Sequence, residues 1–318
     1  MWHQSSFKQL SRVQMRQVGS LVTVALYDSL AGGSSNPRHT PLYHLDFLPA
    51  ARTISGNEGV FNVQEFVADR YETARQVYNY DLSNDSIDGQ DAFFRLTVAS
   101  IPVVVSYPYV STKELGNRLQ VLEDHYLKYQ RAESRDRIRH WTHAMQHILL
   151  RYLCECKNPI RNTSLEGICS PEICTLLDEI TREEISAMSS SLLVDLNSLT
   201  SELNNIDTIA YASLRIFRFI THENTSLACG LQKLKDLRGG VIREMNEKPD
   251  QLPFIARFLE FVSIYIAVLL GSRFGARNMP CDLVQTVPDV DLVCSLALSI
   301  AQYTWNPNYV HAGVLPQS

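Results

Sequence analysis

The sequence lacks a long uncharged hydrophobic run, a secretion signal and an even set of regularly spaced cysteines. Its most apolar stretch, residues 254–270, is interrupted by Arg257 and Glu260, whereas a membrane span needs about 20 residues with almost no charge. The first residues are polar and contain no apolar core segment. Seven cysteines at irregular spacing favour reduced thiols. We therefore expect an intracellular, cytoplasmic protein with no membrane insertion.

Four linear signatures of chemistry are also missing. The chain contains neither a phosphate-binding loop nor a dinucleotide-binding glycine pattern, and it lacks the zinc-protease helix motif and the nucleophile elbow. Its net charge of -5 is not basic enough overall to demand nucleic acid as a partner. These absences predict that the protein binds no cofactor. No linear motif supports its classification as an enzyme.

The first third of the chain contains segments typical of strands. Residues 21–27 are apolar and β-branched, residues 42–48 form a second such segment, and residues 93–107 read as an edge strand kinked at Pro102. A short helix over residues 6–18 is expected to end at Gly19. Together with a helix capped by Asn62 that runs to about residue 78, these segments predict a small mixed α/β part over residues 1–108.

The remainder, residues 109–318, has the periodicity of helices. A capping box at residues 111–114 opens a helical stretch over 112–156 that we expect to break near residues 130–134. Pro171 opens another helix, and two more are expected over residues 253–270 and 290–305. The predicted fold class is α+β and predominantly α-helical, with a multi-helix bundle after the N-terminal part. Whether the two parts share one core is left open.

A heptad repeat is the clearest periodicity in the chain. Apolar residues recur every seven positions between residues 185 and 210, with a second set four residues later. Such a seam suits a contact inside a helical bundle, and self-association through it is the alternative.

A basic segment over residues 128–161 is the most suggestive cluster. Eight basic side chains fall in these 34 residues, opposed only by Glu133, Asp136 and Glu155. Helical geometry places three histidines of this segment opposite its apolar face. The face fits a solvated surface, a metal site using His143 and His147, or a contact for RNA or an acidic partner, since arginine binds phosphate and carboxylate with two donors at once. The candidate contact residues are Lys128, Arg131, Arg135, Arg137, Arg139, His140, His143, His147 and Arg151.

Four cysteines leave one further metal interpretation open. Their spacing departs from the usual zinc pattern, and two of them diverge on a helix, so buried thiols are the alternative to zinc thiolates. The residues are Cys154, Cys156, Cys169 and Cys174.

Three functions are compatible with these features. The first is a non-enzymatic structural or assembly protein, a helical subunit that docks to other protein subunits or to itself, for example in a virus particle or ribonucleoprotein. The second is an RNA or phosphate-backbone binder that uses residues 128–161. The third is an enzyme whose site is assembled from distant residues and has no linear motif. The absence of catalytic signatures favours the first.

Overall fold

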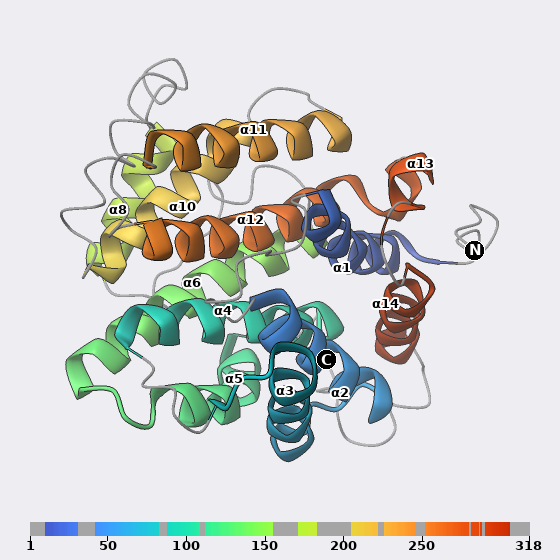
Figure 1. Ribbon diagram of the computed structural model, residues 1–318, viewed down its shortest axis with the longest axis horizontal. Helices are drawn as coiled ribbons and strands as arrows, with labels where there is room; N and C mark the ends of the chain where they lie inside the picture. The colour runs from blue at the N-terminus through green and yellow to red at the C-terminus, as the bar shows by residue number, and fades with distance from the viewer. Residues whose placement is uncertain are drawn as a thin grey trace.

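The computed structural model of the protein is a bundle of helices (Figure 1). It describes residues 10–30, 42–82, 88–108, 112–154, 171–182, 205–221, 226–245, 252–279, 281–285, 287 and 290–305. In chain order the helices are α1 (Arg12–Leu30), the π-helical η2 (Tyr43–Phe47), α2 (Leu48–Gly56), α3 (Val63–Tyr78), α4 (Gly89–Ser106), α5 (Thr112–Leu127), α6 (Ala132–Cys154), α8 (Pro171–Arg182), α10 (Ile206–Thr221), α11 (Leu227–Met245), α12 (Leu252–Phe274), the 3-10 turn η4 (Ala276–Asn278), α13 (Cys281–Val284) and α14 (Val290–Trp305).

The predicted mixed α/β part, and with it the α+β fold class, is wrong. The described residues contain no strand. Residues 21–27 lie in α1, residues 42–48 form η2 and the start of α2, and residues 93–107 fall almost entirely in α4, with Pro102 inside the helix. These segments are buried on nearly all sides, and a short run that is apolar throughout has no period by which a strand can be told from a buried helix.

Hydroxyl side chains in the misread segments are satisfied within their own helices. In α1, Thr23 Oγ1 donates to the carbonyl of Gly19 at 2.7 Å, and Ser20 Oγ donates to the carbonyl of Arg16 at 2.7 Å. In α4, Ser100 Oγ donates to the carbonyl of Thr97 at 2.8 Å. Buried Ser and Thr therefore need no partner on a neighbouring strand, and tertiary burial overrides their preference for extended backbone.

Helices with a visible cap or break were predicted correctly. Asn62 caps α3 through its side-chain oxygen, which accepts from the backbone N–H groups of Gln64 and Glu65. The break expected near residues 130–134 separates α5 from α6, and Pro171 opens α8. The buried helix after residue 252 and the last helix from residue 290 are also confirmed. Most of the heptad seam lies outside the described residues, which resume at 205.

α1 and α12 cross with their backbones in contact. A Cβ atom added to Gly19 would lie 2.8 Å from Gly275 Cα and closer still to the Gly271 carbonyl oxygen, and one added to Gly271 would lie 2.6 Å from Thr23 Oγ1. One residue further along each helix, Ser20 Oγ and Ser272 Oγ share a hydrogen bond of 2.7 Å. Only glycine permits this approach, so the pair Gly19 and Gly271 sets the distance between the two helices.

Polar side chains of α1 bind the ends of three other helices. Gln17 donates to the carbonyl of Val105 in α4 at 2.6 Å, Arg16 to that of Leu153 in α6 at 2.8 Å, and Gln14 to that of Ala301 in α14 at 3.1 Å. Carbonyls in the last turn of a helix lack partners within the helix. α1 thus supplies or supplements hydrogen bonds that those C-terminal segments need, and this explains why its first turns are both polar and buried.

One apolar core runs through the molecule, and it includes residues from both sides of position 108. For example, the rings of Phe94 in α4 and Phe261 in α12 stack with centroids 4.7 Å apart. Among the described residues one helix, Phe254–Phe274, is long and apolar enough to cross a membrane, but 78% of its most apolar window is buried inside the protein. We interpret it as the core helix, which agrees with the expectation from Arg257 and Glu260. The domain boundary near residue 108 stays a prediction.

Candidate active site

Several side chains of the predicted basic face contact other residues of the same chain. Arg139 Nε and His143 Nε2 each lie 2.6 Å from a different oxygen of Glu123 in α5, whose side chain is only 1% exposed. Burial opposes ionisation of Glu123, but the hydrogen bonds and charges of His143 and Arg139 outweigh it and lower its pKa. This cluster joins α5 to α6, so the side chains of Arg139 and His143 have a structural role.

Other members of the face are divided between internal contacts and the surface. Arg137 Nε lies 3.3 Å from Asp207 Oδ1, Arg135 donates to the carbonyl of Gln130, and His147 is buried. Lys128 and Arg131 are exposed, whereas His140 and Arg151 are partly buried. The predicted contact with RNA or an acidic partner stays a prediction.

Neither metal interpretation gains support from the described residues. No group of three or more His, Cys, Asp or Glu side chains in the described ranges could hold a metal ion. Cys154 donates to the carbonyl of Pro108 at 2.9 Å, and Cys174 is partly buried. Cys156 and Cys169 lie outside the described residues.

His147 predicts a loss of stability in acid. Burial, followed by the charges of His143 and Arg151, lowers its pKa from 6.5 to about 4. Because unfolding restores the ordinary pKa, protonation favours the unfolded chain as the pH falls from about 6.5 towards 4. We expect His147 to account for about 2 kcal/mol of lost unfolding free energy between pH 7 and pH 5. Urea unfolding should therefore show a smaller loss over this range in His147→Gln, and an equal loss in variant and wild type would contradict the assignment.

A second polar cluster joins helices that are far apart in the sequence. α1 runs antiparallel to α12, since Gly19 lies against Gly271 and Met15 lies against Gly275. Asp28 near the end of α1 is thereby within electrostatic reach of Glu260 in α12. His44 of η2 lies beside Asp28, with 3.6 Å between His44 Nε2 and Asp28 Oδ2. Tyr78 closes the cluster from the last residue of α3, since its ring lies against His44 with centroids 6.1 Å apart.

Glu260 is held in place from two sides. Its Oε1 atom accepts from the backbone N–H of Leu42 at 2.6 Å, and its Oε2 atom accepts from Arg257 at 3.2 Å. Burial raises the pKa of Glu260, Arg257 and the Leu42 N–H lower it, and Asp28 raises it again, so that the net shift is upward. At a given pH Glu260 therefore keeps its proton more often than an exposed glutamate does.

Asp91 anchors the arginine that holds Glu260. Its Oδ1 atom accepts from Arg257 Nε at 3.0 Å and from a second Arg257 nitrogen at 2.9 Å, and its Oδ2 atom pairs with Arg95. Burial opposes ionisation of Asp91, but the two guanidinium groups outweigh it and lower the pKa to about 2. The start of α4 is therefore joined to α12 by a buried ion pair that fixes the Arg257 side chain.

Tyr78 supplies a hydroxyl that stays protonated. Burial, then the charges of Asp28 and Glu260, raise its pKa to about 12, so it can donate a hydrogen bond throughout the physiological range. The side chains of Asp28, His44 and Glu260 are 24%, 36% and 15% exposed, so each can be reached from solvent. The cluster thus combines two carboxylates, of which Glu260 has a raised pKa, with a hydroxyl donor, an arrangement suited to general acid–base chemistry.

A comparison with solved structures finds a similar fold. The fold of this chain resembles that of a solved ADP-ribosylglycohydrolase-related protein complex. The TM-score is 0.56 at 13% sequence identity, and the match covers 93% of this chain and 100% of the other. No family model and no curated protein sequence matches the chain.

This likeness corrects the predicted function. We expected a non-enzymatic structural or assembly subunit, such as a virion component, because no catalytic motif is visible. The shared fold is that of a protein related to a hydrolase, so the classification as a non-enzyme is wrong, as are the structural and virion assignments. The helical-bundle prediction is supported. Among the three hypotheses, the one that agrees with the fold is an enzyme whose site is assembled from distant residues.

Proposed function

We propose that the protein is a hydrolase that cleaves the glycosidic bond of an ADP-ribosyl group. The observation that carries the proposal is the approach of Asp28 and Glu260 from two separate helices, with Glu260 held at a raised pKa. Glycosidic bonds are commonly hydrolysed by two carboxyl groups, one that gives a proton and one that is ionised. The fold likeness supports the choice of an ADP-ribosyl substrate, because the similar protein is described as ADP-ribosylglycohydrolase-related.

Glu260 is assigned as the general acid. It gives its proton to the leaving group as the bond between the ribose anomeric carbon and that group breaks. Asp28 takes a proton from water as the water oxygen bonds to the same carbon, and His44 beside it orients its carboxylate. The Tyr78 hydroxyl donates to a substrate oxygen. Arg257, fixed by Asp91, acts as a positioning residue because it holds one oxygen of Glu260.

Loss of the acid should abolish most of the activity. Glu260→Gln keeps an oxygen that can accept from Leu42 but cannot release a proton. We expect it to lower kcat for release of ADP-ribose from an ADP-ribosylated protein at least about 100-fold, the usual contribution of a general acid. Asp28→Asn should have an effect of similar size. The released ADP-ribose is measured by chromatography over time.

A matched substitution controls for the loss of a carboxylate. Glu133 is exposed in the first turn of α6, so Glu133→Gln should retain wild-type kcat. The proposal fails when the wild-type protein releases ADP-ribose no faster than the buffer, or when Glu260→Gln is as active as wild type. Thermal unfolding of each variant checks that a lost rate is not a lost fold.

We also propose a reducing, intracellular setting and an association with other subunits. The described cysteines Cys154, Cys174, Cys229 and Cys294 form no disulfide, which supports a reducing compartment. Native mass spectrometry of the protein isolated from its source tests the second point, since it reports bound subunits or a second copy of the chain directly.

A further inference from the structure

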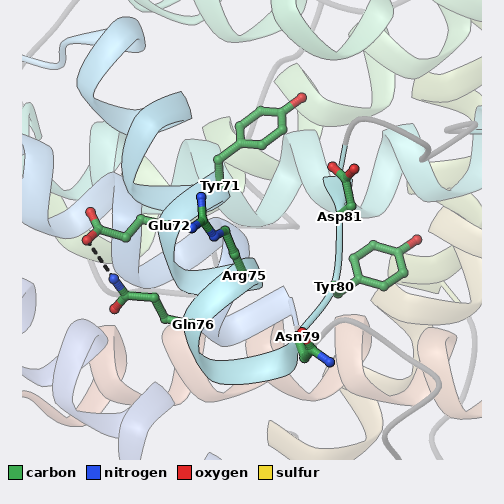
Figure 2. A pocket seen from close by; sticks show the side chains of 7 residues that line it. All are labelled: Tyr71, Glu72, Arg75, Gln76, Asn79, Tyr80 and Asp81. Atoms are coloured by element: carbon green, nitrogen blue, oxygen red, sulfur yellow. Dashed lines mark hydrogen bonds between the residues drawn. The ribbon is translucent and has the colours of Figure 1, made fainter.

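A pocket of about 720 Å³ lies beside the C-terminal half of α3 (Figure 2), and its described lining includes none of the candidate active-site residues Asp28, His44, Tyr78 and Glu260. We call it the α3 pocket. The described residues that line it are Tyr71, Glu72, Arg75, Gln76, Asn79, Tyr80 and Asp81. Its volume is in the range of pockets that hold small molecules, roughly 300–1,000 Å³.

A helix-terminating turn builds the second wall of the pocket. Asn79 adopts a left-handed conformation with φ of 49°, and the backbone N–H of Tyr80 donates to the carbonyl of Ala74 at 3.0 Å. A residue in the left-handed conformation is a common way for a helix to end. It sends residues 79–81 back beside the helix, as Figure 2 shows, so that two stretches of one chain enclose the hollow.

The returning segment is anchored in the core. Leu82 is buried in a small cluster with Leu45 and Ala74, against which Tyr78 packs. Leu45 also receives a hydrogen bond on its carbonyl oxygen from Arg70 at 2.8 Å. The wall formed by Tyr80 and Asp81 is thus fixed at both ends, by the turn and by Leu82, and the pocket is a feature of the folded chain.

The chemical groups of the α3 pocket match the parts of a nucleotide. Tyr71 and Tyr80 are 43% and 39% exposed, and exposed aromatic rings stack on bases. Arg75 is exposed and forms no ion pair with any residue that the structure describes, which leaves its fork for a phosphate. Glu72, bound by Gln76 at 2.9 Å, and Asp81 offer oxygens that accept from ribose hydroxyls, as acidic residues do in dinucleotide sites.

The balance of charge restricts the ligand further. The lining of the pocket contains two carboxylates and one guanidinium, so a bare phosphate gains from Arg75 and loses to Glu72 and Asp81. A ligand that also brings hydroxyl donors converts those carboxylates from a repulsive into an attractive contact. We propose that the α3 pocket binds a ribonucleoside monophosphate. This inference does not depend on the proposed hydrolase activity.

Calorimetric titration with AMP and with adenosine tests the assignment. Tyr71→Ala and Tyr80→Ala should each weaken both ligands about fivefold or more, since a stacked base contributes about 1–3 kcal/mol. Arg75→Ala should weaken AMP about tenfold and leave adenosine unchanged, because only AMP carries the phosphate. Tyr129 is 86% exposed and does not line the pocket, so Tyr129→Ala serves as the control and should bind as wild type does.

Each outcome decides the proposal. It is overturned by absence of AMP binding at millimolar concentration, by equal binding of inorganic phosphate, by binding of methylguanidinium in place of AMP, or by wild-type affinity in Tyr80→Ala. The same titration with Glu260→Gln separates the two proposals, since that variant should bind AMP with unchanged affinity even though its hydrolysis of the ADP-ribosyl bond is strongly reduced.

Discussion

Replacing Gly271 with alanine should lower the free energy of unfolding by at least about 3 kcal/mol, at or above the upper end for overpacked positions. The added Cβ would meet the backbone of Gly19 within van der Waals contact and Thr23 Oγ1 at 2.6 Å. Backbone cannot move aside as a flexible side chain can, so α1 and α12 must separate. Separation also breaks the 2.7 Å hydrogen bond between Ser20 and Ser272. Urea unfolding followed by circular dichroism measures the change.

Gly239→Ala is the matched control, because Gly239 lies in α11 with no atom within 4 Å of an added Cβ. Alanine has the higher helix propensity, so this variant should be about 0.5–1 kcal/mol more stable than wild type. Opposite signs for the same substitution in two helices would show that the effect at Gly271 comes from the helix crossing. A Gly271→Ala protein as stable as wild type would contradict the close approach.

The same crossing explains one failure of sequence interpretation. Glycine after a run of helical periodicity usually marks a helix end, so a helix end was predicted at Gly19. The chain instead continues as helix to Leu30, because the glycine serves contact with α12. The residue that makes glycine necessary is Gly271, more than 200 positions away. No local pattern contains that information.

The mistaken prediction of strands also results from long-range packing. Residues 21–27 are buried on every side by partners from several helices, which removes the alternation that separates strand from helix. α3 and α6 were predicted well because each has a solvent-facing side and a recognisable beginning, Asn62 for α3 and the break after residue 130 for α6. Amphipathic helices are therefore visible in this sequence. Among the buried helices, α12 was recognised from Pro253 and its long apolar run, whereas the buried parts of α1 and α4 were mistaken for strands.

The sequence analysis missed the candidate active site because its residues are distant in the sequence and lie in or next to buried helices. Asp28 follows a segment misread as a strand, and Glu260 lies in a helix that was interpreted only as core. One signal was available: Arg257 and Glu260 are charged residues inside the most apolar stretch of the chain. Buried charges are rare unless paired, and here the pairing connects Glu260 through Arg257 to Asp91. Ionisable residues within an apolar core helix would have been better candidates than the more numerous charges of residues 128–161.

Arg70→Met should be the second strongly destabilising substitution, with an expected loss of about 3–5 kcal/mol in unfolding free energy. Arg70 is almost fully buried and pairs with Asp46 Oδ1 at 3.1 Å. It also donates to the carbonyl of Leu45 and lies over the rings of Phe66 and Tyr126. Methionine fills a similar volume but leaves Asp46 buried without its cation. Urea unfolding at pH 7 measures the loss.

The ion pair of Arg52 with Asp69 provides the comparison for exposure. These side chains are 38% and 27% exposed, and their closest approach is 3.3 Å. Water screens such a pair, so Arg52→Met should cost less than about 1 kcal/mol. Both substitutions replace an arginine with methionine, and the partner left behind is an aspartate in each case. A similar loss for both would mean that burial of Asp46 is not what makes Arg70 important.

Removing the charge of Asp46 should reverse part of the effect of Arg70→Met. The hydroxyl of Tyr126 donates to Asp46 Oδ1 at 2.5 Å, and an asparagine oxygen can accept the same bond. In the double variant Asp46→Asn with Arg70→Met the buried charge is gone, and only the lost hydrogen bonds and ring contacts of Arg70 remain. We expect the double variant to be more stable than Arg70→Met alone, because leaving a buried charge unpaired costs more than losing the pair. A double variant less stable than Arg70→Met would instead show that Arg70 acts mainly through its contacts with Leu45, Phe66 and Tyr126.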